Sequence, residues 1–338
     1  MRNRVLKKSP RFTLLSIAGA IILVCVLLVV MGEGDAAGQG AVRYVKSNGV
    51  ASGACDAWGA ACTLDYAMSQ AVAGDELWLA AGIYTPTVGT GRTKSFTLTS
   101  GVAIYGGFAG AETLRAQRNY TANQVILTGD VGVPGDDSDN AYHVVTAANV
   151  DANTVVDGVT IRDGNANGAN SATASGGGMY IVYGDMTVAN VIFMSNAAGS
   201  YGGGLFTRYG APTLVNLQFN SNQASQGGGA YNRSMVITMT DVVFLNNKAI
   251  FYGGGFYNND GAPVVMNIRF ENNTSSSGGG LYNNDGVLEL TNGYFENNRA
   301  SSLGGGMYSD TSFPRLTAVQ FISNSANSSG GALYLSKD

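Results

Sequence analysis

The sequence has 338 residues, 48 of them glycine, and its 19 basic and 23 acidic side chains give a formal net charge of −4. Residues 1–40 hold 5 of the basic and 2 of the acidic side chains, so the remainder holds 14 against 21, a net charge of −7. Because nucleic acids attract basic surfaces, this balance argues against nucleic acid as a partner.

The chain opens with a basic segment followed by an apolar run. Residues 2–11 include five Lys or Arg residues, and residues 12–31 are uncharged and mostly apolar. A secretory signal has about 7 to 15 apolar residues, whereas about 20 span a bilayer, so residues 1–40 form either a signal peptide or a retained signal anchor. Both alternatives predict an extracytoplasmic protein, at the cell surface, in an outer membrane or secreted, with membrane contact only through this segment. Cys25 follows Val24 rather than a small residue, which favours a buried thiol over lipid attachment.

Two cysteines follow in the predicted N-terminal cap, residues 41–74. Cys55 and Cys62 have six residues between them. In an exported chain such a pair more often forms a disulfide than a metal site, which needs about four ligands. A Cys55–Cys62 disulfide is therefore expected.

A helix is predicted directly after the cysteines. Apolar residues from Leu64 to Val72 recur at helical spacing, with Thr63 placed to cap the start and Gly74 the end. The first coil of a stacked β-structure exposes a strand edge that this helix is expected to cover. Partner binding through the helix is the alternative.

Short β-prone runs between turn residues occupy the next segment. They lie at residues 77–80, 96–98, 102–105, 125–128, 142–146 and 154–161, after a first strand at 44–48. We interpret residues 75–165 as leader coils, followed by an Asn-, Ala- and Ser-rich surface loop at 165–175.

A glycine triplet, relaxed to Gly-Gly-Ala in its last copy, then occurs seven times at intervals of 25 or 26 residues in residues 176–338. Such a regular period is typical of a solenoid. The triplets begin at Gly176, Gly202, Gly227, Gly253, Gly278, Gly304 and Gly330. Two places after each triplet stands an aromatic residue: Tyr180, Phe206, Tyr231, Tyr257, Tyr282, Tyr308 and Tyr334.

A second motif, apolar-x-x-apolar-x-Phe-x-x-Asn, lies between the triplets. Its alternation predicts a short strand that ends at an asparagine. Stacked coils would place these residues in two internal ladders. The pairs are Phe193/Asn196, Phe219/Asn222, Phe244/Asn247, Phe270/Asn273, Phe295/Asn298 and Phe321/Asn324.

This spacing suits either a leucine-rich repeat or a β-helix. Three consecutive glycines would cost roughly 3 kcal/mol in the helix that a leucine-rich repeat usually carries. The predicted fold is therefore all-β: a right-handed, single-stranded parallel β-helix over residues 75–338, with a capping helix before it.

The paired motifs Gly-Gly-Gly/Ala-x-Tyr and Phe-x-x-Asn resemble the repeat of the polymorphic outer-membrane proteins of chlamydiae. They are also similar to the wider set of bacterial β-helix surface proteins with pectin-lyase-like architecture. The resemblance covers about half the chain as repeats. It implies surface display and adhesion rather than one particular reaction.

Candidate catalytic and metal-binding residues are few. Asp130, Asp136, Asp137 and Asp139 share a loop with Asn140 that suits either Ca²⁺ or a solvated acidic turn, and the turn is favoured. His143, the single histidine, has no acid partner at a recognisable spacing and is interpreted as structural. In the repeats, Asp260, Asp285 and Asp310 stand beside Gly or Thr, where turns favour aspartate.

The aromatic column is the remaining candidate site. Its residues alternate with Met179, Leu205, Ala230, Phe256, Leu281, Met307 and Leu333. If these point inward, the aromatics form an outer ladder, flanked by Asn232, Asn258, Asn259, Asn283 and Asn284, that either binds a glycan or protein or only stabilises the coil face. The predicted function is a non-enzymatic adhesin or binding scaffold without a cofactor, and the alternatives are a polysaccharide lyase or hydrolase and a passive stalk.

Overall fold

The computed structural model describes residues 40–234 and 236–337. The chain divides into two units, Met1–Gln39 and Gly40–Asp338. The predicted export segment at residues 12–31 and Cys25 lie outside the described residues, so both remain predictions. Within the described part, no helix combines the length and apolar character needed to cross a membrane.

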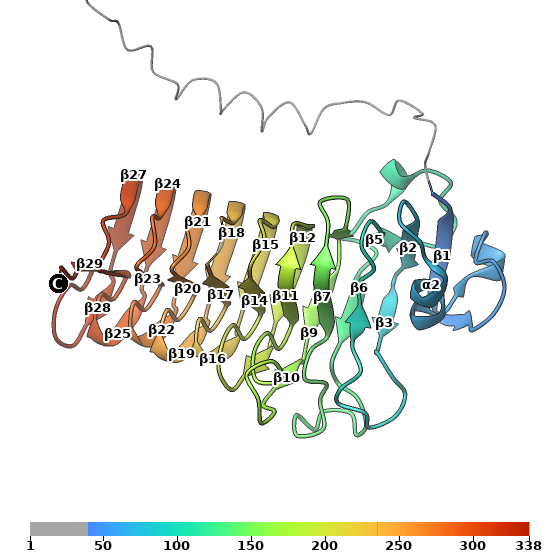
Figure 1. The fold of residues 1–338 in the computed structure, drawn as a ribbon, viewed down its shortest axis with the longest axis horizontal. Coiled ribbons are helices and arrows are strands. Elements are labelled where there is room, and N and C mark those ends of the chain that lie inside the picture. Colours follow the sequence, from blue (N-terminus) through green and yellow to red (C-terminus); the bar gives the residue numbers. More distant parts are fainter. Residues whose placement is uncertain (1–39, 235, 338) are drawn as a thin grey trace, which may run out of the picture. The chain divides into compact units, whose positions relative to one another are not determined.

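Residues 40–337 form a parallel β-helix, a stack of coils in which every pairing between strands is parallel (Figure 1). One regular coil contributes β20 (Phe256–Asn259), β21 (Val264–Glu271) and β22 (Thr274–Ser277), one strand to each of three sheets. The fold class predicted from the repeats is confirmed. The third strand of each coil was not predicted, because segments such as Thr274–Ser277 are polar and lack apolar alternation.

The three sheets, called A, B and C here, run along the stack. Sheet A contains β1 (Val42–Val50), β2 (Glu76–Ala80), β3 (Gly82–Tyr84), β5 (Ala103–Phe108), β6 (Val125–Thr128), β8 (Val155–Asp157), β9 (Thr160–Arg162), β12 (Thr187–Met194), β15 (Thr213–Asn220), β18 (Thr238–Leu245), β21, β24 (Glu289–Glu296) and β27 (Arg315–Ile322). Sheet B contains β4 (Phe96–Thr97), β7 (Val145–Val150), β11 (Met179–Gly184), β14 (Leu205–Arg208), β17 (Ala230–Arg233), β20, β23 (Leu281–Asn284), β26 (Met307–Asp310) and β29 (Leu333–Leu335). Sheet C contains β10 (Asn165–Ala166), β13 (Ala197–Ala198), β16 (Gln223–Gln226), β19 (Lys248–Tyr252), β22, β25 (Arg299–Leu303) and β28 (Ser325–Ala326).

The phenylalanine ladder fills the interior beneath sheet A. Phe244 and Phe270 are fully buried, and their stacked ring centroids lie 4.9 Å apart. The other neighbouring rings of the ladder stack at 4.6 to 4.7 Å, and they belong to Phe193, Phe219, Phe295 and the partly buried Phe321. Because this distance equals the spacing of paired strands, one ring per coil gives continuous contact along the stack.

The asparagine ladder closes the end of each sheet A strand. Oδ1 of Asn273 accepts hydrogen bonds from both the backbone N–H and Nδ2 of Asn247, each 2.9 Å long. Nδ2 of Asn273 in turn donates to the carbonyl of Phe244 and to Oδ1 of Asn298. Each middle member of the ladder thus bonds to the coil on either side of it, as a stacked asparagine should.

The first member of the asparagine ladder, Asn196, has a different neighbour on its N-terminal side from the members that follow it. Asn196 stacks on a leader coil that has Gly164 in place of an asparagine. Its Oδ1 accepts from the backbone N–H of Gly164, and its Nδ2 donates to the carbonyl of Ile161 and to Oδ1 of Asn222, each bond 3.0 Å long. The side-chain ladder therefore begins at Asn196 and meets only backbone on its N-terminal side.

The last member differs as well. Asn324 accepts from Nδ2 of Asn298 at 2.9 Å and donates to the carbonyl of Phe295 at 2.8 Å. It is half-buried, whereas Asn222 and the other earlier members are buried. Asn324 therefore belongs to the ladder as predicted, but it is less buried than the other members because no further strand of sheet A follows β27 within the described residues.

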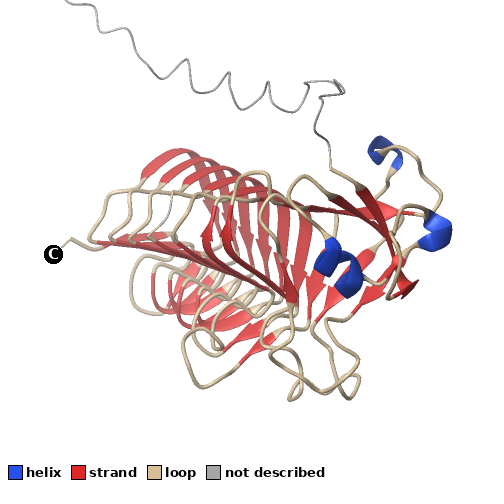
Figure 2. Ribbon diagram, turned by 45° about the vertical axis from the view of Figure 1, so that its right-hand side comes forward, coloured by secondary structure: helices blue, strands red, loops and turns tan. Residues whose placement is uncertain are grey.

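The N-terminal end carries the helical segments, which Figure 2 shows confined to that end. They are α2 (Leu64–Gln70) and two 3-10 turns, η1 (Trp58–Ala60) and η2 (Arg115–Gln117). Cys55 and Cys62 form the expected disulfide. Leu64 and Ala67 of α2 are buried in the same core cluster as Leu77 of the first coils, so α2 covers that end of the core.

Three details of the predicted cap were wrong. Thr63 occupies the N-cap position, but its side chain makes no capping hydrogen bond. The helix ends at Gln70, so Val72 lies beyond it and is exposed, and Gly74 belongs to the following turn rather than to the helix terminus. No glycine stands between Leu64 and Gly74, so the sequence contains no turn residue that would mark the end of the helix at Gln70. The predicted loop at 165–175 also differs, because it begins with the short strand β10.

Candidate functional site

The aromatic column is not an exposed binding surface, which corrects the prediction. Strand parity is as expected, because Met179, Leu281 and their equivalents face the interior of the coil. The aromatics lie on the other face of sheet B, but Tyr231 is 2% and Tyr257 is 6% exposed. Phe206, Tyr282 and Tyr308 are also buried, and Tyr180 and Tyr334 at the two ends pack partly buried against them.

Side chains that directly precede three of the glycine triplets, Tyr201, Tyr252 and Leu303, pack against this column. Tyr201 lies 4.7 Å from Tyr231, and Tyr252 lies 4.7 Å from Tyr282, between ring centroids. Burial raises the pKa of Tyr231. The column is therefore a second hydrophobic core. The alternation of residues in the sequence predicts which face of a strand a side chain takes, but it does not predict whether another segment covers that face.

The asparagines expected to flank an exposed stripe also lie inside. Nδ2 of Asn232 donates to Oδ1 of Asn258, which donates in the same way to Asn283, each bond 2.7 Å long. All three side chains are fully buried, whereas Asn259 and Asn284 lie on the outer face and bond to each other at 2.9 Å. Sheet B therefore has its own internal polar ladder, parallel to the one at the end of sheet A.

The asparagine ladder at the end of sheet A presents no amide to a ligand. Every member uses both its carbonyl oxygen and its amide nitrogen in bonds to the neighbouring coils. Five members are at most 1% exposed, and the sixth, at the C-terminal end, is half-buried. In chain order they are Asn196, Asn222, Asn247, Asn273, Asn298 and Asn324.

The acidic loop holds its carboxylates by bonds to its own backbone. Asp130 accepts from the N–H of Gly135, and Asp139 accepts from that of Val133. Asp136 accepts from the N–H of Ser138, and Asp137 accepts weakly from the Asn140 amide at 3.4 Å. Oδ1 of Asp139 and Oδ1 of Asn140 are buried without a hydrogen bond, but the described residues contain no group of three or more His, Cys, Asp or Glu placed to hold a metal. These contacts are those of an acidic turn.

The remaining predicted candidates have structural surroundings. Nδ1 of His143 lies 3.0 Å from the carbonyl oxygen of Gly176, and its ring packs 5.2 Å from that of Tyr180. Because a carbonyl only accepts, Nδ1 carries the proton. Burial lowers the pKa of His143. Asp260 and Asp285 lie in turns with φ of 57° and 50°, and Asp310 accepts a hydrogen bond from the Tyr282 hydroxyl.

A groove on the outer face of sheet A is the candidate site, and the sequence did not predict it. It has a volume of about 330 Å³. Four successive coils form its floor, contributing residues 158–160, 190–192 and 216–218 together with Asp241 and Val243. The loop after β5 forms its wall, with Tyr120, Thr121 and Gln124. Tyr120 is 37% and Ile192 is 38% exposed, so the groove offers apolar surface beside amide and hydroxyl groups.

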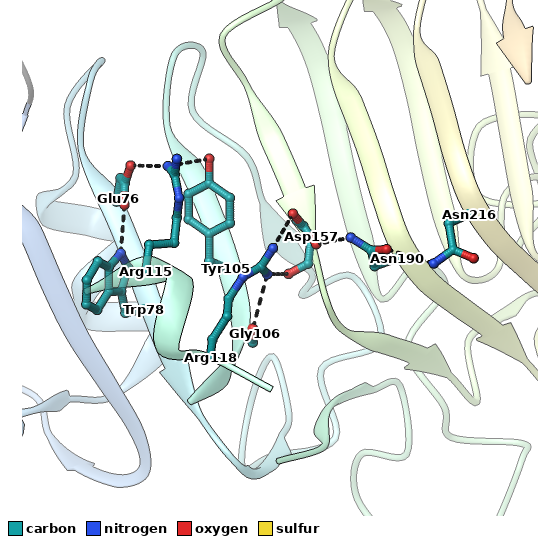
Figure 3. A network of polar contacts seen from close by, with 9 residues as sticks. All are labelled: Glu76, Trp78, Tyr105, Gly106, Arg115, Arg118, Asp157, Asn190 and Asn216. Carbon is teal, nitrogen blue, oxygen red and sulfur yellow. Dashed lines mark hydrogen bonds and ion pairs between the residues drawn. The ribbon is translucent and has the colours of Figure 1, made fainter. Parts of the chain in front are cut away.

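Two arginines fasten the wall to the sheet (Figure 3). Arg118 forms a 2.6 Å ion pair with Asp157 and also donates to the carbonyl of Gly106. Arg115 forms a 2.6 Å ion pair with Glu76 and donates to the hydroxyl of Tyr105. Both guanidinium groups therefore have carboxylate partners, and they position Tyr120 rather than present free positive charge.

Two glycines allow the wall to approach this closely. A Cβ at Gly107, where φ is 103°, would lie 2.7 Å from the Tyr120 backbone. A Cβ at Gly158, where φ is 76°, would lie 3.0 Å from the Tyr120 side chain. Larger residues at these positions would push Tyr120 away from the groove.

A ladder of Asn and Asp runs along the outer face of sheet A, and its first three members line the groove floor. Its members stand three residues before each Phe of the repeat and adopt φ between 51° and 57°, a conformation that Asn and Asp tolerate better than most residues. They are Asn190, Asn216, Asp241, Asn267 and Asn292. The recurrence of Asn or Asp at this position is the sequence signal that would have found the floor. The wall has no such signal, because it occurs once.

These features define the class of protein as a parallel β-helix with an external groove. A solved structure titled "Crystal structure of pectate lyase Pel9A" matches with a TM-score of 0.53 and 14% sequence identity, covering 89% of this chain and 77% of that one. At this identity the match shows the fold alone. Residues 267–284 and 318–336 match the model of the Chlamydia polymorphic membrane protein repeat, so the resemblance seen in the repeats is confirmed there. No curated protein sequence matches the chain.

Proposed function

We propose that this protein is a surface-displayed, non-enzymatic β-helix that binds a glycan in the groove on sheet A. The observation that carries the proposal is the pairing of Tyr120 with a floor of amide groups. A sugar ring has an apolar face that stacks on an aromatic ring and hydroxyls that bond to amides. The repeat matches support surface display, since their family is named for membrane proteins.

A second candidate is polysaccharide cleavage, favoured by the fold shared with pectate lyase Pel9A. Proton transfer at a glycosidic bond or sugar ring needs a positioned acid or base, and hydrolysis usually needs a pair of carboxyl groups. Among the described residues that line the groove, Asp241 is the one ionisable carboxylate, and neither Lys, Arg nor His is present. This composition favours binding over cleavage.

The test uses purified residues 41–338 and a panel of immobilised neutral, amino and acidic polysaccharides. Retention is measured together with the release of reducing or unsaturated ends. We expect retention without product, and Tyr120→Ala is expected to reduce it about tenfold, because stacking on an aromatic ring is lost. Tyr183→Ala is the matched control, since Tyr183 is 56% exposed and lies outside the groove.

Two results would contradict the proposal. Formation of product that disappears in Asp241→Asn would establish the enzyme. Absence of retention on every polysaccharide, with retention on cells or on a protein instead, would leave the protein-binding or stalk alternatives. Export is tested separately by fusing residues 1–40 to a reporter that is active only outside the cytoplasm.

A further inference from the structure

The polar ladder on the groove floor runs in one direction. Asn190 donates from Nδ2 to Asp157 at 2.7 Å, and Asn216 donates to Oδ1 of Asn190 at 2.7 Å. This direction is imposed by Asp157, because its carboxylate only accepts and also holds Arg118. Oδ1 of Asn216 is therefore left on the side away from Asn190, as Figure 3 shows.

A second chain of bonds runs the same way on the following coils. Asn292 donates to Asn267 at 2.7 Å, and Asn267 donates to Oδ1 of Asp241 at 2.9 Å. The pairs Val215↔Thr240 and Leu217↔Val242 on either side place Asn216 opposite Asp241. The free amide oxygen of one chain thus meets the carboxylate of the other. Two acceptors face each other there, with no donor from the described residues between them.

The polar ladder is interrupted inside the groove, between Asn216 and Asp241, and these two acceptors determine which chemical group can bind there. Asn216 and Asp241 both line the groove. A group that bridges them must donate at least two hydrogen bonds, and the carboxylate favours a positive charge. A sugar hydroxyl donates one, whereas a primary ammonium donates three. Arg118 of the wall is already paired with Asp157, and no ion pair is formed by Asp241 within the described residues.

We propose that the groove selects glycans that carry a free amino group, with the ammonium bound between Oδ1 of Asn216 and the carboxylate of Asp241. This inference rests on the proposed function and adds the class of sugar. The floor spans three inter-coil spacings of about 4.8 Å, roughly 14 Å in all, which suits a chain of sugars rather than a single point contact. The polyanionic substrate implied by the name of the pectate lyase relative would instead be repelled by Asp241.

The experiment compares a glucosamine oligosaccharide with its N-acetylated counterpart, which has the same backbone but lacks the charge and two of the donors. A neutral glucose oligomer and an oligogalacturonate complete the set. We expect the amine to bind at least about tenfold more tightly than the N-acetylated form, the usual scale of a charge-assisted hydrogen bond. Oligogalacturonate is expected to bind least.

The decisive variant is Asp241→Asn. Its amide can donate to Oδ1 of Asn216 and complete the ladder, so thermal stability should not fall while the preference for the amine disappears. Asp260→Asn is the matched control: it makes the same charge change at the same φ of 57° on another corner of the coil. It should leave the preference unchanged.

The outcomes separate this inference from the proposed function. Equal binding of the amine and the N-acetylated form, or an unchanged preference in Asp241→Asn, overturns the inference and leaves a glycan-binding groove. If Asp260→Asn also loses the preference for the amine, the amine is attracted to the acidic surface in general, and this result also overturns the inference. Absence of binding by all four oligosaccharides contradicts the proposed function itself.

Discussion

Asn247 donates a 2.9 Å hydrogen bond from Nδ2 to Oδ1 of Asn273, one coil further on, and both side chains are fully buried. The same oxygen also accepts from the backbone N–H of Asn247. Each asparagine in the middle of the ladder therefore satisfies buried polar groups of the coils on both sides of it. Removal of one side chain leaves partners on both sides without bonds.

Asn273→Ala is expected to lower the free energy of unfolding by about 3 kcal/mol, because buried groups left without partners cost about 1 to 3 kcal/mol each. Urea denaturation of residues 41–338 measures the change. Asn153→Ala is the control, since Asn153 is exposed in a turn. Asn324→Ala should cost less than Asn273→Ala, because Asn324 is only half-buried at the end of the ladder. Equal midpoints for Asn273→Ala and Asn153→Ala would show that the ladder does not contribute to stability.

Phe270→Ala should cost more, about 3 to 5 kcal/mol, because it opens a cavity in the continuous ring stack. The Phe270 ring contacts the rings of Phe244 and Phe295 at 4.9 and 4.6 Å. Phe313→Ala is the matched change at a residue that is 66% exposed. An unfolding midpoint in Phe270→Ala as high as in Phe313→Ala would place Phe270 outside the core.

Tyr257→Ala tests the corrected role of the aromatic column. Tyr257 is buried between Tyr231 and Tyr282, each with its ring centroid 5.0 Å away, so its loss is expected to destabilise the protein by about 3 kcal/mol. Below the unfolding temperature, glycan retention should match the unsubstituted protein. A stable Tyr257→Ala protein with lost retention would restore the column as the binding site.

His143 should make stability depend on pH. Its pKa is lowered by burial from the ordinary 6.5, so the unfolded chain takes up a proton at a higher pH than the folded protein does. The stabilisation is therefore complete above pH 6.5 and is lost as pH falls below it toward the folded pKa. His143→Gln removes this titration. The free energy of unfolding of the unsubstituted protein, relative to that of the variant, should therefore decline below pH 6.5. A difference that stays constant from about pH 8 to 5 would contradict this assignment.

The Cys55–Cys62 disulfide should leave no reactive thiol in denatured, unreduced residues 41–338, and two after reduction. Their sequence separation of 7 encloses a small loop, so Cys55→Ser with Cys62→Ser should lower the free energy of unfolding by about 2 kcal/mol. Thiol titration and denaturation measure these effects. Two thiols before reduction would contradict the pairing.

The sequence alone determined the repeat and its two main columns. Phe270 and Asn273 recur at a fixed offset from the glycine triplet, and a residue that appears once per coil must stack on its equivalents. Strand alternation likewise assigned Met179 and Tyr180 to opposite faces of one strand. These inferences use only local periodicity, which a one-dimensional stack preserves.

The ends of the ladder show where periodicity stops being informative. Asn196 and Asn324 carry the same motif as Asn222, yet one bonds to the backbone of a leader coil and the other is half-buried. The sequence motif is the same in every coil, but the first and last asparagines have different neighbours from those in the middle of the ladder. The environment of a terminal rung therefore follows from the stack and not from the repeat.

The tertiary structure decided what covers each face. Tyr231 and Tyr257 point to the outer face of sheet B yet are buried, because Tyr201 and Tyr252 pack over them. The groove exists because a non-repeating loop brings Tyr120 beside Asn190, residues far apart in the chain. Periodicity carries no information about contacts between a repeat and a segment that occurs once, and those contacts depend on the closed three-dimensional path of the coil.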